Sequence, residues 1–208
     1  MCAEKQNQIA SETRGITNEK KLLRKSMRSV ISSYFAENDV ASVSEKTCSR
    51  FCDCEFFKSA DYVLSFVTNK FEIGTSTLNE KAFESTRLAL PRVASGTDLD
   101  FFVLDKNCAS VSEQLESGSF GIMEPKTSLE KLDVASLSGK KVLVAVPGIA
   151  FTKSGKRCGY GRGYYDRFLR KLRGCGAVTK FVGLCLPCQI IEEVPTDEYD
   201  VVLDDVLF

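Results

Sequence analysis

The first part of the chain has a helical period of apolar residues. From Asn18 on, apolar side chains recur at spacings of three and four, which predicts an amphipathic helix. They are Leu23, Met27, Val30, Ile31 and Tyr34. A second helix is expected from Asp39 to Phe57. Residues Met1 to Thr17 are polar and aperiodic, so we predict a loose tail there and a single domain over residues 18–208.

Farther along, the period becomes that of strands. The segment Asp61–Val67 (DYVLSFV) is short, β-branched and aromatic, as a buried strand is. Other expected strands are Arg87–Leu90, Leu99–Leu104, Lys141–Val146, Lys180–Leu186 and one near Tyr199–Leu203. Residues 105–138 are polar with little pattern, and Tyr164–Leu172 is predicted to be helical. Strands that alternate with helices indicate an α/β sandwich around a largely parallel sheet.

The composition argues against several classes of protein. The 208 residues include 28 basic and 28 acidic side chains, so the net charge is zero. A protein devoted to nucleic acid or to an anionic membrane surface is usually basic, so we expect neither partner. No apolar run approaches the roughly 20 residues that span a bilayer. The N-terminal residues match neither a secretory signal nor a typical transit peptide, and we expect a cytoplasmic protein.

Cysteine and histidine content limits the possible chemistry. Nine cysteines, an odd number without an export signal, favour buried thiols over a disulfide scaffold. Cys185 and Cys188 form a lone C-x-x-C, which is compatible with a redox motif or half a zinc site but is more often structural. The chain has no histidine, which excludes Ser-His-Asp and Cys-His nucleophilic mechanisms.

The segment that points to a function is the glycine-rich stretch Arg157–Asp166 (RCGYGRGYYD). Its three glycines alternate with other residues, which lets backbone N–H groups approach an anion without a Cβ in the way. Its two arginines have the planar fork that matches phosphate oxygens. The helix that follows would place its positive N-terminal end at the same anion, and Asp166 could hold Mg²⁺ there. The alternative is an ordinary surface turn.

The stretch matches neither of the common nucleotide-binding signatures. A P-loop needs G-x-x-x-x-G-K-[ST], and Gly139-Lys140 and Gly155-Lys156 lack the upstream glycine and the following hydroxyl. A dinucleotide fingerprint would need a glycine at Tyr164 and a strand directly before the first glycine.

The stretch Val146–Leu169 (VPGIAFTKSGKRCGYGRGYYDRFL) resembles the signature of the 5-formyltetrahydrofolate cyclo-ligase family, also called 5,10-methenyltetrahydrofolate synthetase. That family carries a Pro-Gly-x-x-Phe turn and then G-x-R-x-G-x-G-x-G-Y-Y-D, and every fixed position is present here, from Gly155 to Asp166. The resemblance runs from Lys20 nearly to the C-terminus. It implies a three-layer α/β/α Rossmann-like sandwich around a mostly parallel sheet, and a monomer.

The resemblance also implies roles for matching residues. Lys20 and Arg24 have the spacing of a lysine and an arginine that reach the ATP phosphates. Glu72 matches a glutamate that contacts folate, Val67 lies at another substrate contact, and Pro91-Arg92 resembles a Pro-Arg strand end. The implied ATP contacts in the loop are Arg157, Cys158, Gly159, Tyr160, Gly161, Arg162, Gly163, Tyr164 and Tyr165. The implied folate contacts are Tyr160, Gly161, Arg162, Gly163 and Tyr164.

Within that set, the implied catalytic residues are Arg157, Arg162 and Tyr164. Asp166 and Asp204 match two aspartates that hold magnesium in the family. This chain departs from many members at Tyr199, where they have histidine before the aspartate that is Asp200 here, and at Cys158, where they have leucine.

The reaction that the resemblance implies is ATP-driven ring closure. The formyl oxygen of 5-formyltetrahydrofolate, alone or polyglutamylated, attacks the γ-phosphate of ATP; N10 then attacks the activated carbon, and 5,10-methenyltetrahydrofolate, ADP and phosphate result. One alternative is a phosphosugar isomerase or acyl-transferase on a similar fold, with Glu72 as the base and no use of ATP. Another is a nucleic-acid binder with an Arg/Gly/Tyr-rich segment, which would be basic and carry many copies.

Overall fold

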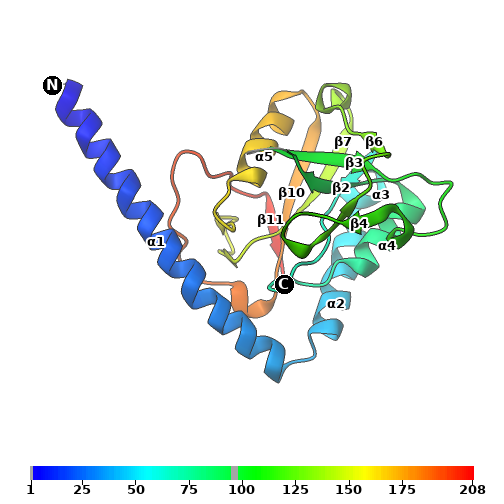
Figure 1. Cartoon of the computed structure of the whole chain (residues 1–208), viewed down its shortest axis with the longest axis horizontal. Helices are drawn as coiled ribbons and strands as arrows, with labels where there is room; N and C mark the ends of the chain where they lie inside the picture. Colours follow the sequence, from blue (N-terminus) through cyan, green and yellow to red (C-terminus); the bar gives the residue numbers. More distant parts are fainter. Residues whose placement is uncertain (1, 95–97) are drawn as a thin grey trace.

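The computed structural model describes residues 2–94 and 98–208, with side chains from residue 15 on except those of 95–97 and Phe120. A seven-stranded sheet forms its centre, in the order β11-β10-β7-β1-β2-β3-β6. The strands are β1 (Tyr62–Leu64), β2 (Arg87–Val93), β3 (Leu99–Val103), β6 (Glu130–Lys131), β7 (Lys141–Val146), β10 (Val178–Leu184) and β11 (Asp205–Leu207). Figure 1 shows the sheet between helices.

The sheet is mostly parallel, as the sequence predicts. β2, β1, β7, β10 and β11 run parallel to one another, whereas β3 and β6 are antiparallel to their neighbours. After β1, the chain adds β2 on one side and later returns to add β7 on the other. The order therefore reverses between β1 and β7, and in open α/β sheets such a switch point is where ligands bind.

Alternating side chains divide the core into two layers. In β7, Leu143 and Ala145 pack on one face, while Val142 and Val144 pack on the other. The first face is covered by α1 (Cys2–Glu37), α2 (Val40–Asp53), α3 (Glu55–Lys58) and α4 (Ser76–Ser85). The second is covered by α5 (Tyr164–Gly174), which buries Phe168, Leu169 and Leu172. The expected three-layer α/β/α sandwich is thus confirmed.

Two small hairpins lie outside the main sheet. One pairs β4 (Leu115–Ser117) with β5 (Met123–Pro125), inside the segment where the sequence shows little pattern. The other pairs β8 (Ala150–Phe151) with β9 (Arg157–Cys158) and so forms the base of the glycine-rich loop.

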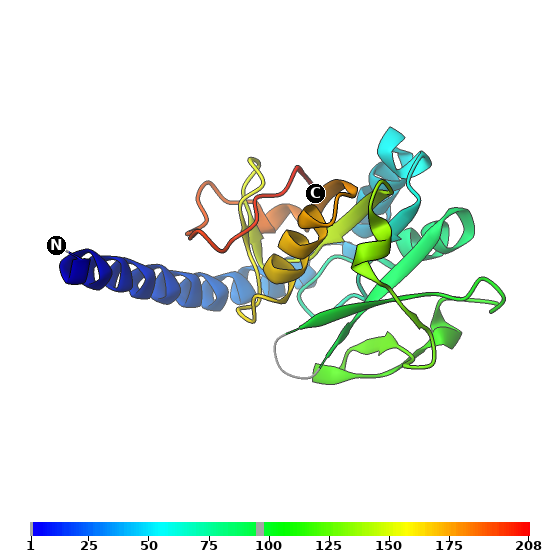
Figure 2. The same ribbon diagram turned by 90° about the horizontal axis from the view of Figure 1, so that it is seen from above.

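Helix α1 is longer than the sequence predicts. We expect a loose tail before Asn18, but α1 begins at Cys2, and its first turns project from the rest of the molecule (Figures 1 and 2). The tail pattern misleads because residues 3–14 are mostly good helix formers without an apolar stripe, and extending an existing helix costs little. Among residues 2–94 and 98–208, no helix combines the length and apolar character needed to cross a bilayer.

The last strand lies later than the sequence predicts. Residues 199–203 form a loop, and β11 pairs with β10 only from Asp205 on. The loop is held by the glycine-rich segment instead, because Leu203 N donates to Gly155 O at 2.9 Å. Gly155 has φ +88°, and a Cβ there would overlap the Leu203 carbonyl oxygen, so the contact requires glycine.

Candidate active site

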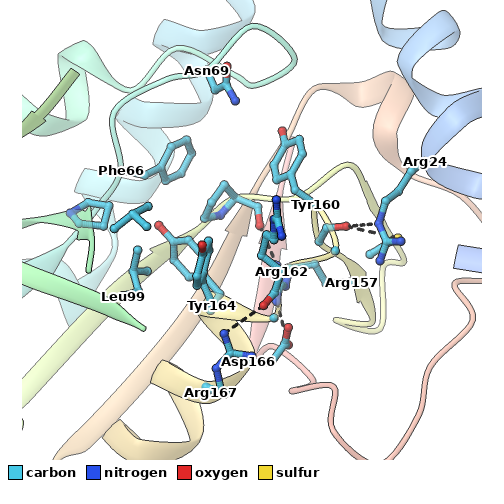
Figure 3. Close-up of a pocket in the computed structure, with 18 of the residues that line it drawn as sticks. Arg24, Phe66, Asn69, Leu99, Arg157, Tyr160, Arg162, Tyr164, Asp166 and Arg167 are labelled. Atoms are coloured by element: carbon cyan, nitrogen blue, oxygen red, sulfur yellow. Dashed lines mark hydrogen bonds and ion pairs between the residues drawn. The ribbon is translucent and has the colours of Figure 1, made fainter. Parts of the chain in front are cut away.

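A cavity of about 810 Å³ opens at the switch point of the sheet. Its walls include Phe66 and Val67, which follow β1, and Pro147, which follows β7. The glycine-rich loop and the start of α5 form another wall, and the polar face of α1 closes one side. In Figure 3 Arg24 lies on one side of the loop and Phe66 and Leu99 lie on the other. One end of the cavity is therefore charged and the other is apolar.

The loop has a backbone that only glycine adopts easily. Gly161 has φ +99°, and Gly163 has φ +65° and is the N-cap of α5 in the left-handed conformation. Arg24 packs over the loop, donating from Nε to Gly159 O at 2.7 Å. A Cβ at Gly161 would lie 3.2 Å from the Arg24 guanidinium carbon. The loop therefore stays open along its backbone, next to a cation and a helix N-terminus, which suits an anion.

Arg157 lies beneath the loop and is buried. Its Nη2 donates to Asp166 Oδ1 at 2.8 Å, and its Nη1 donates to Pro147 O at 3.1 Å. Among the described residues, its Nε has no hydrogen-bond partner. Asp166 Oδ1 also accepts from Val201 N at 3.2 Å, which ties α5 to the C-terminal loop. The Arg157–Asp166 pair thus fixes the loop, and it leaves one buried N–H without a protein acceptor.

Lys20 forms the ion pairs at the other side of the charged end. Its Nζ lies 2.8 Å from Asp197 Oδ2 and 2.5 Å from Asp200 Oδ2. Burial lowers the pKa of Lys20, but the two carboxylates outweigh burial, so the net pKa is raised. Burial raises the pKa of Asp197, but the hydrogen bond and charge of Lys20 together with backbone N–H donors outweigh burial, so the net pKa is lowered. All three side chains line the cavity.

The apolar end is bounded by the segment after β1, by β2 and β3, and by a hairpin. Its aliphatic and aromatic lining comes from the end of β1, from the β2–β3 pair and from the β4–β5 hairpin. These residues are Phe66, Val67, Pro91, Val93, Leu99, Ile122 and Met123. Such a surface suits a flat, largely apolar ligand with few polar groups.

Glu72 is a buried carboxylate at this end. It is 7% exposed, and its Oε2 accepts from Asn69 N at 2.7 Å. Its loop is fixed from behind, since Gly74 N donates to Ser44 Oγ at 2.9 Å and Thr75 Oγ1 donates to Phe66 O at 2.7 Å. Burial raises the pKa of Glu72 to about 7, although the Asn69 N–H opposes that shift.

Most residues that the sequence singles out line this one cavity. They are Lys20, Arg24, Val67, Glu72, Arg157, Cys158, Gly159, Tyr160, Gly161, Arg162, Gly163, Tyr164, Tyr165 and Asp166. Asp204 does not line it. Its carboxylate accepts from Phe181 N at 2.7 Å, within β10, and from Arg173 Nη2 at 3.3 Å. The structure therefore brings Asp166 to the cavity but leaves Asp204 on the sheet.

Sequence reasoning misses several of the lining residues. Asp197 and Asp200 come from an irregular loop that carries no local pattern, and Arg28 lies one turn after Arg24 on a face that resembles a solvated one. The hairpin residues Ile122 and Met123 belong to a segment that shows no period. Only Asp200 had a usable signal, because it stands in the position of an aspartate shared with the resembled family.

The cysteines are thiols, as predicted. All eight with described side chains are free, and burial raises the pKa of Cys158 above that of an ordinary thiol. Cys158 therefore lines the cavity as a small neutral side chain, and burial likewise raises the pKa of Cys188 to about 11.

The fold and the cavity define a doubly wound α/β protein with a glycine-rich loop beside an apolar pocket. The sequence pattern of the 5-formyltetrahydrofolate cyclo-ligase family matches residues 16–208, and the chain belongs to that family.

Individual proteins agree with this assignment. The chain is 28% identical over 190 residues to a probable 5-formyltetrahydrofolate cyclo-ligase of Caenorhabditis elegans, covering 89% of this chain and 90% of that one. It is 38% identical over 93 residues to the 5-formyltetrahydrofolate cyclo-ligase of Haemophilus influenzae, covering 45% and 47% of the two chains. The solved 5,10-methenyltetrahydrofolate synthetase of Aquifex aeolicus superimposes with a TM-score of 0.70 at 29% identity, covering 90% of this chain and 88% of that one.

Proposed function

We propose that this chain closes 5-formyltetrahydrofolate to 5,10-methenyltetrahydrofolate with ATP and Mg²⁺, releasing ADP and phosphate. The observation that carries the proposal is one cavity with two unlike ends: a glycine loop among charges, and an apolar pocket with a buried carboxylate. The first suits a nucleotide triphosphate and the second a pterin. A cavity of about 810 Å³ lies within the usual range for small-molecule sites.

The charged end supports binding of the ATP phosphates. Lys20, Arg24 and the positive end of α5 surround the loop, whose glycines leave its backbone open to phosphate oxygens. The Nε of Arg157, which has no hydrogen-bond partner among the described residues, could donate to a phosphate oxygen. We assign contacts with ATP to these groups and to the loop residues that the family resemblance names.

The carboxylates at this end fit Mg²⁺ that is held jointly by the protein and the nucleotide. Among the described residues there is no cluster of three or more acidic, cysteine or histidine side chains that could hold an ion alone. Mg²⁺ in phosphate-transfer sites commonly takes one or two carboxylates and completes its shell with phosphates and water. We assign that role to Asp166 and Asp200, which both line the charged end, and bound Mg²⁺ would neutralise phosphate charge. Asp204, the resemblance's second candidate, would have to leave β10 first.

Tyr199 offers a surface for the nucleotide base. It lines the cavity with 57% of its surface exposed, and the Arg170 guanidinium lies 5.6 Å from its ring centre. Purine rings stack favourably on aromatic side chains and on guanidinium planes. We assign the adenine to this rim, beyond the ion pairs of Lys20.

The apolar end supports binding of the folate. A pterin presents adjacent N–H donors along one edge, and the ionised Glu72 carboxylate could accept two of them. Tyr160 lies beside Glu72, whose charge, together with burial, raises the pKa of the phenol. Tyr160 therefore stays protonated as a donor near the same carboxylate. Phe66, Val67 and Leu99 would cover the ring.

The chemistry asks the protein mainly for position and charge. In phosphoryl transfer, catalysis comes from alignment of the groups and from stabilisation of charge on the phosphate, with no covalent step on the protein. Arg157, Arg162 and Tyr164 stand in the loop that separates the two ends, which suits a role at the formyl–phosphate junction. A chain without histidine can perform this reaction.

The proposal is tested by activity. Purified protein with Mg²⁺, ATP and 5-formyltetrahydrofolate should produce the methenyl chromophore, with ADP formed in equal amount. A folded protein that produces no chromophore contradicts the proposal. Nucleotide hydrolysis that depends on folate would exclude the phosphosugar isomerase and acyl-transferase alternatives. We extend the proposal to a cytoplasmic monomer that uses no nucleic-acid partner.

A further inference from the structure

The β4–β5 hairpin covers the apolar end, yet it belongs to no larger sheet. Ile122, Met123 and Glu124, from its turn and β5, line the cavity together with Val93 and Leu99. A two-stranded hairpin is at most marginally stable alone, so other contacts must hold it in place. Leu115 packs against the core at one end of the hairpin. Polar contacts hold it as well: next to β4, the buried Gln114 side chain accepts from Asp105 N at 2.6 Å, and a further polar anchor comes from β2.

Arg92 of β2 provides that anchor. Its Nη1 donates to Glu116 Oε1 of β4 at 2.7 Å and to Pro125 O of β5 at 2.8 Å. Its Nε lies 3.7 Å from Glu124 Oε2. One guanidinium therefore reaches both strands of the hairpin, which the planar fork of arginine allows and the single ammonium of lysine does not. Arg92 itself does not line the cavity.

Glu124 makes the anchor sensitive to charge. Its side chain is 6% exposed, and its Oε1 accepts from Val93 N at 3.2 Å. A Cβ at Gly118 would overlap the Glu124 carboxylate, so the hairpin closes tightly over it. A buried carboxylate that loses its cation is costly, and exposing it to water relieves the cost. Without Arg92, the hairpin would be driven away from β2.

We propose that Arg92 is the positioning residue for the folate end: it holds the hairpin over β2 and β3, so that Ile122 and Met123 close the apolar pocket. This inference rests on the proposed function only in assigning folate to that end. The nucleotide end lies across the glycine loop and shares none of these contacts. Loss of Arg92 should therefore weaken one ligand and spare the other.

The first experiment replaces Arg92 by Met, which keeps an unbranched apolar stem and removes the charge. We expect the KM for 5-formyltetrahydrofolate to rise about 10-fold or more, while the Kd of Mg·ATP stays within about twofold. Amide hydrogen exchange should speed up over residues 115–125 and stay unchanged in β7. The matched control is Arg87→Met on the same strand, which breaks the exposed Arg87–Glu130 pair (3.1 Å) far from the cavity and should change neither quantity.

The second experiment is a rescue. Adding Glu124→Gln to Arg92→Met removes the uncompensated charge while an amide oxygen can still accept from Val93 N. We expect it to recover at least half of the lost folate affinity on a logarithmic scale, whereas adding Glu116→Gln recovers none. If Arg92→Met does not fold, Glu116→Gln alone should raise the folate KM about 1.5- to 5-fold, as expected for a half-exposed pair.

A folded Arg92→Met protein with an unchanged folate KM overturns the inference, and so does an equal loss for both ligands. Failure of the wild-type protein to bind folate would instead count against the proposed function. In that case hydrogen exchange still decides the matter: unchanged exchange over residues 115–125 in Arg92→Met refutes the anchor.

Discussion

At the end of the cavity beside α1, basic side chains are paired with carboxylates, whereas at the other end the Glu72 carboxylate is buried beside an apolar surface. Lys20 is held by Asp197 and Asp200, and Arg157 by Asp166, so every pair can exchange its partner for a phosphate or a metal ion. Among the described side chains no cation pairs with Glu72, which accepts a backbone N–H from Asn69. The first end is ready for a highly charged ligand, and the second gains most from a ligand that brings its own N–H donors.

The largest expected effect is that of Gly161→Val, which should damage the charged end and leave the other end intact. Valine resists a φ of +99°, and its Cβ would lie 3.2 Å from the Arg24 guanidinium carbon. Strain together with the loss of a phosphate hydrogen bond totals about 4 kcal/mol, or about a thousandfold in kcat/KM for ATP. Folate affinity, measured separately by titration, should change less than about twofold, because a side chain at Gly161 would meet Arg24 of the charged end. That result would count against the folate contact that the resemblance implies for Gly161. Equal damage to both ligands would mean that the loop does not separate the two ends.

At the folate end, Glu72 should make the stability of the protein depend on pH. The pKa of Glu72 is raised from 4.5 to about 7, so the folded protein keeps a proton that the unfolded chain releases. Stability therefore falls as pH rises through that window, by about 3 kcal/mol in total for the ligand-free protein.

Urea unfolding at several pH values should show this loss in the wild type and not in Glu72→Gln. The difference between the two proteins cancels the contributions of other groups. Parallel curves for the two proteins would mean that Glu72 titrates as an ordinary exposed acid.

Metal dependence separates the two aspartates that could assist Asp166. Asp200 lines the charged end, so Asp200→Asn should raise the Mg²⁺ concentration for half-maximal rate about 10-fold, as the loss of one carboxylate ligand would. Asp204 bonds to Phe181 N and Arg173, so Asp204→Asn should lower the melting temperature and leave the Mg²⁺ requirement nearly unchanged. The opposite pattern would restore the role that the family resemblance gives to Asp204.

The smallest expected effect is at Tyr199. Tyr199→Ala should weaken the binding of Mg·ATP about fivefold, which is the lower end of the range for losing one base–aromatic stack. Tyr199→Phe keeps the ring and should not weaken binding. Inorganic tripolyphosphate, which has no base, should bind both variants as it binds the wild type. Val202→Ala, an exposed change in the same loop, serves as the control. Equal weakening of tripolyphosphate would mean that Tyr199 only shapes the loop.

The sequence predicts the sheet and the loop better than their surroundings, for a physical reason. The bounds of β7 agree with the predicted strand Lys141–Val146, because a strand buried on both faces has consecutive apolar residues, here Val142–Val146. The cavity contacts of Gly161 and Gly163 follow from the spacing of glycines in one short stretch.

The charged end was harder to foresee because its partners come from separate loops. Lys20 and Asp200 are 180 residues apart, and nothing local in either segment requires the other. Arg92 and Glu124 likewise meet across a segment with no period. Val30, although it fits the helical stripe of α1, is 44% exposed because the helix leaves the core on that side. Tertiary contact, and not pattern, decides these positions.

The central claim is that the two ends bind different ligands independently, and crossed calorimetric titrations test it most directly. Mg·ATP and 5-formyltetrahydrofolate would each be titrated into the wild type, Gly161→Val and Glu72→Gln. We predict that Gly161→Val loses Mg·ATP and keeps folate. Glu72→Gln should keep Mg·ATP and bind folate more weakly by about 1–3 kcal/mol, the cost of mispaired buried groups. If either variant weakens both ligands to the same degree, or if Glu72→Gln binds folate as the wild type does, the account is contradicted.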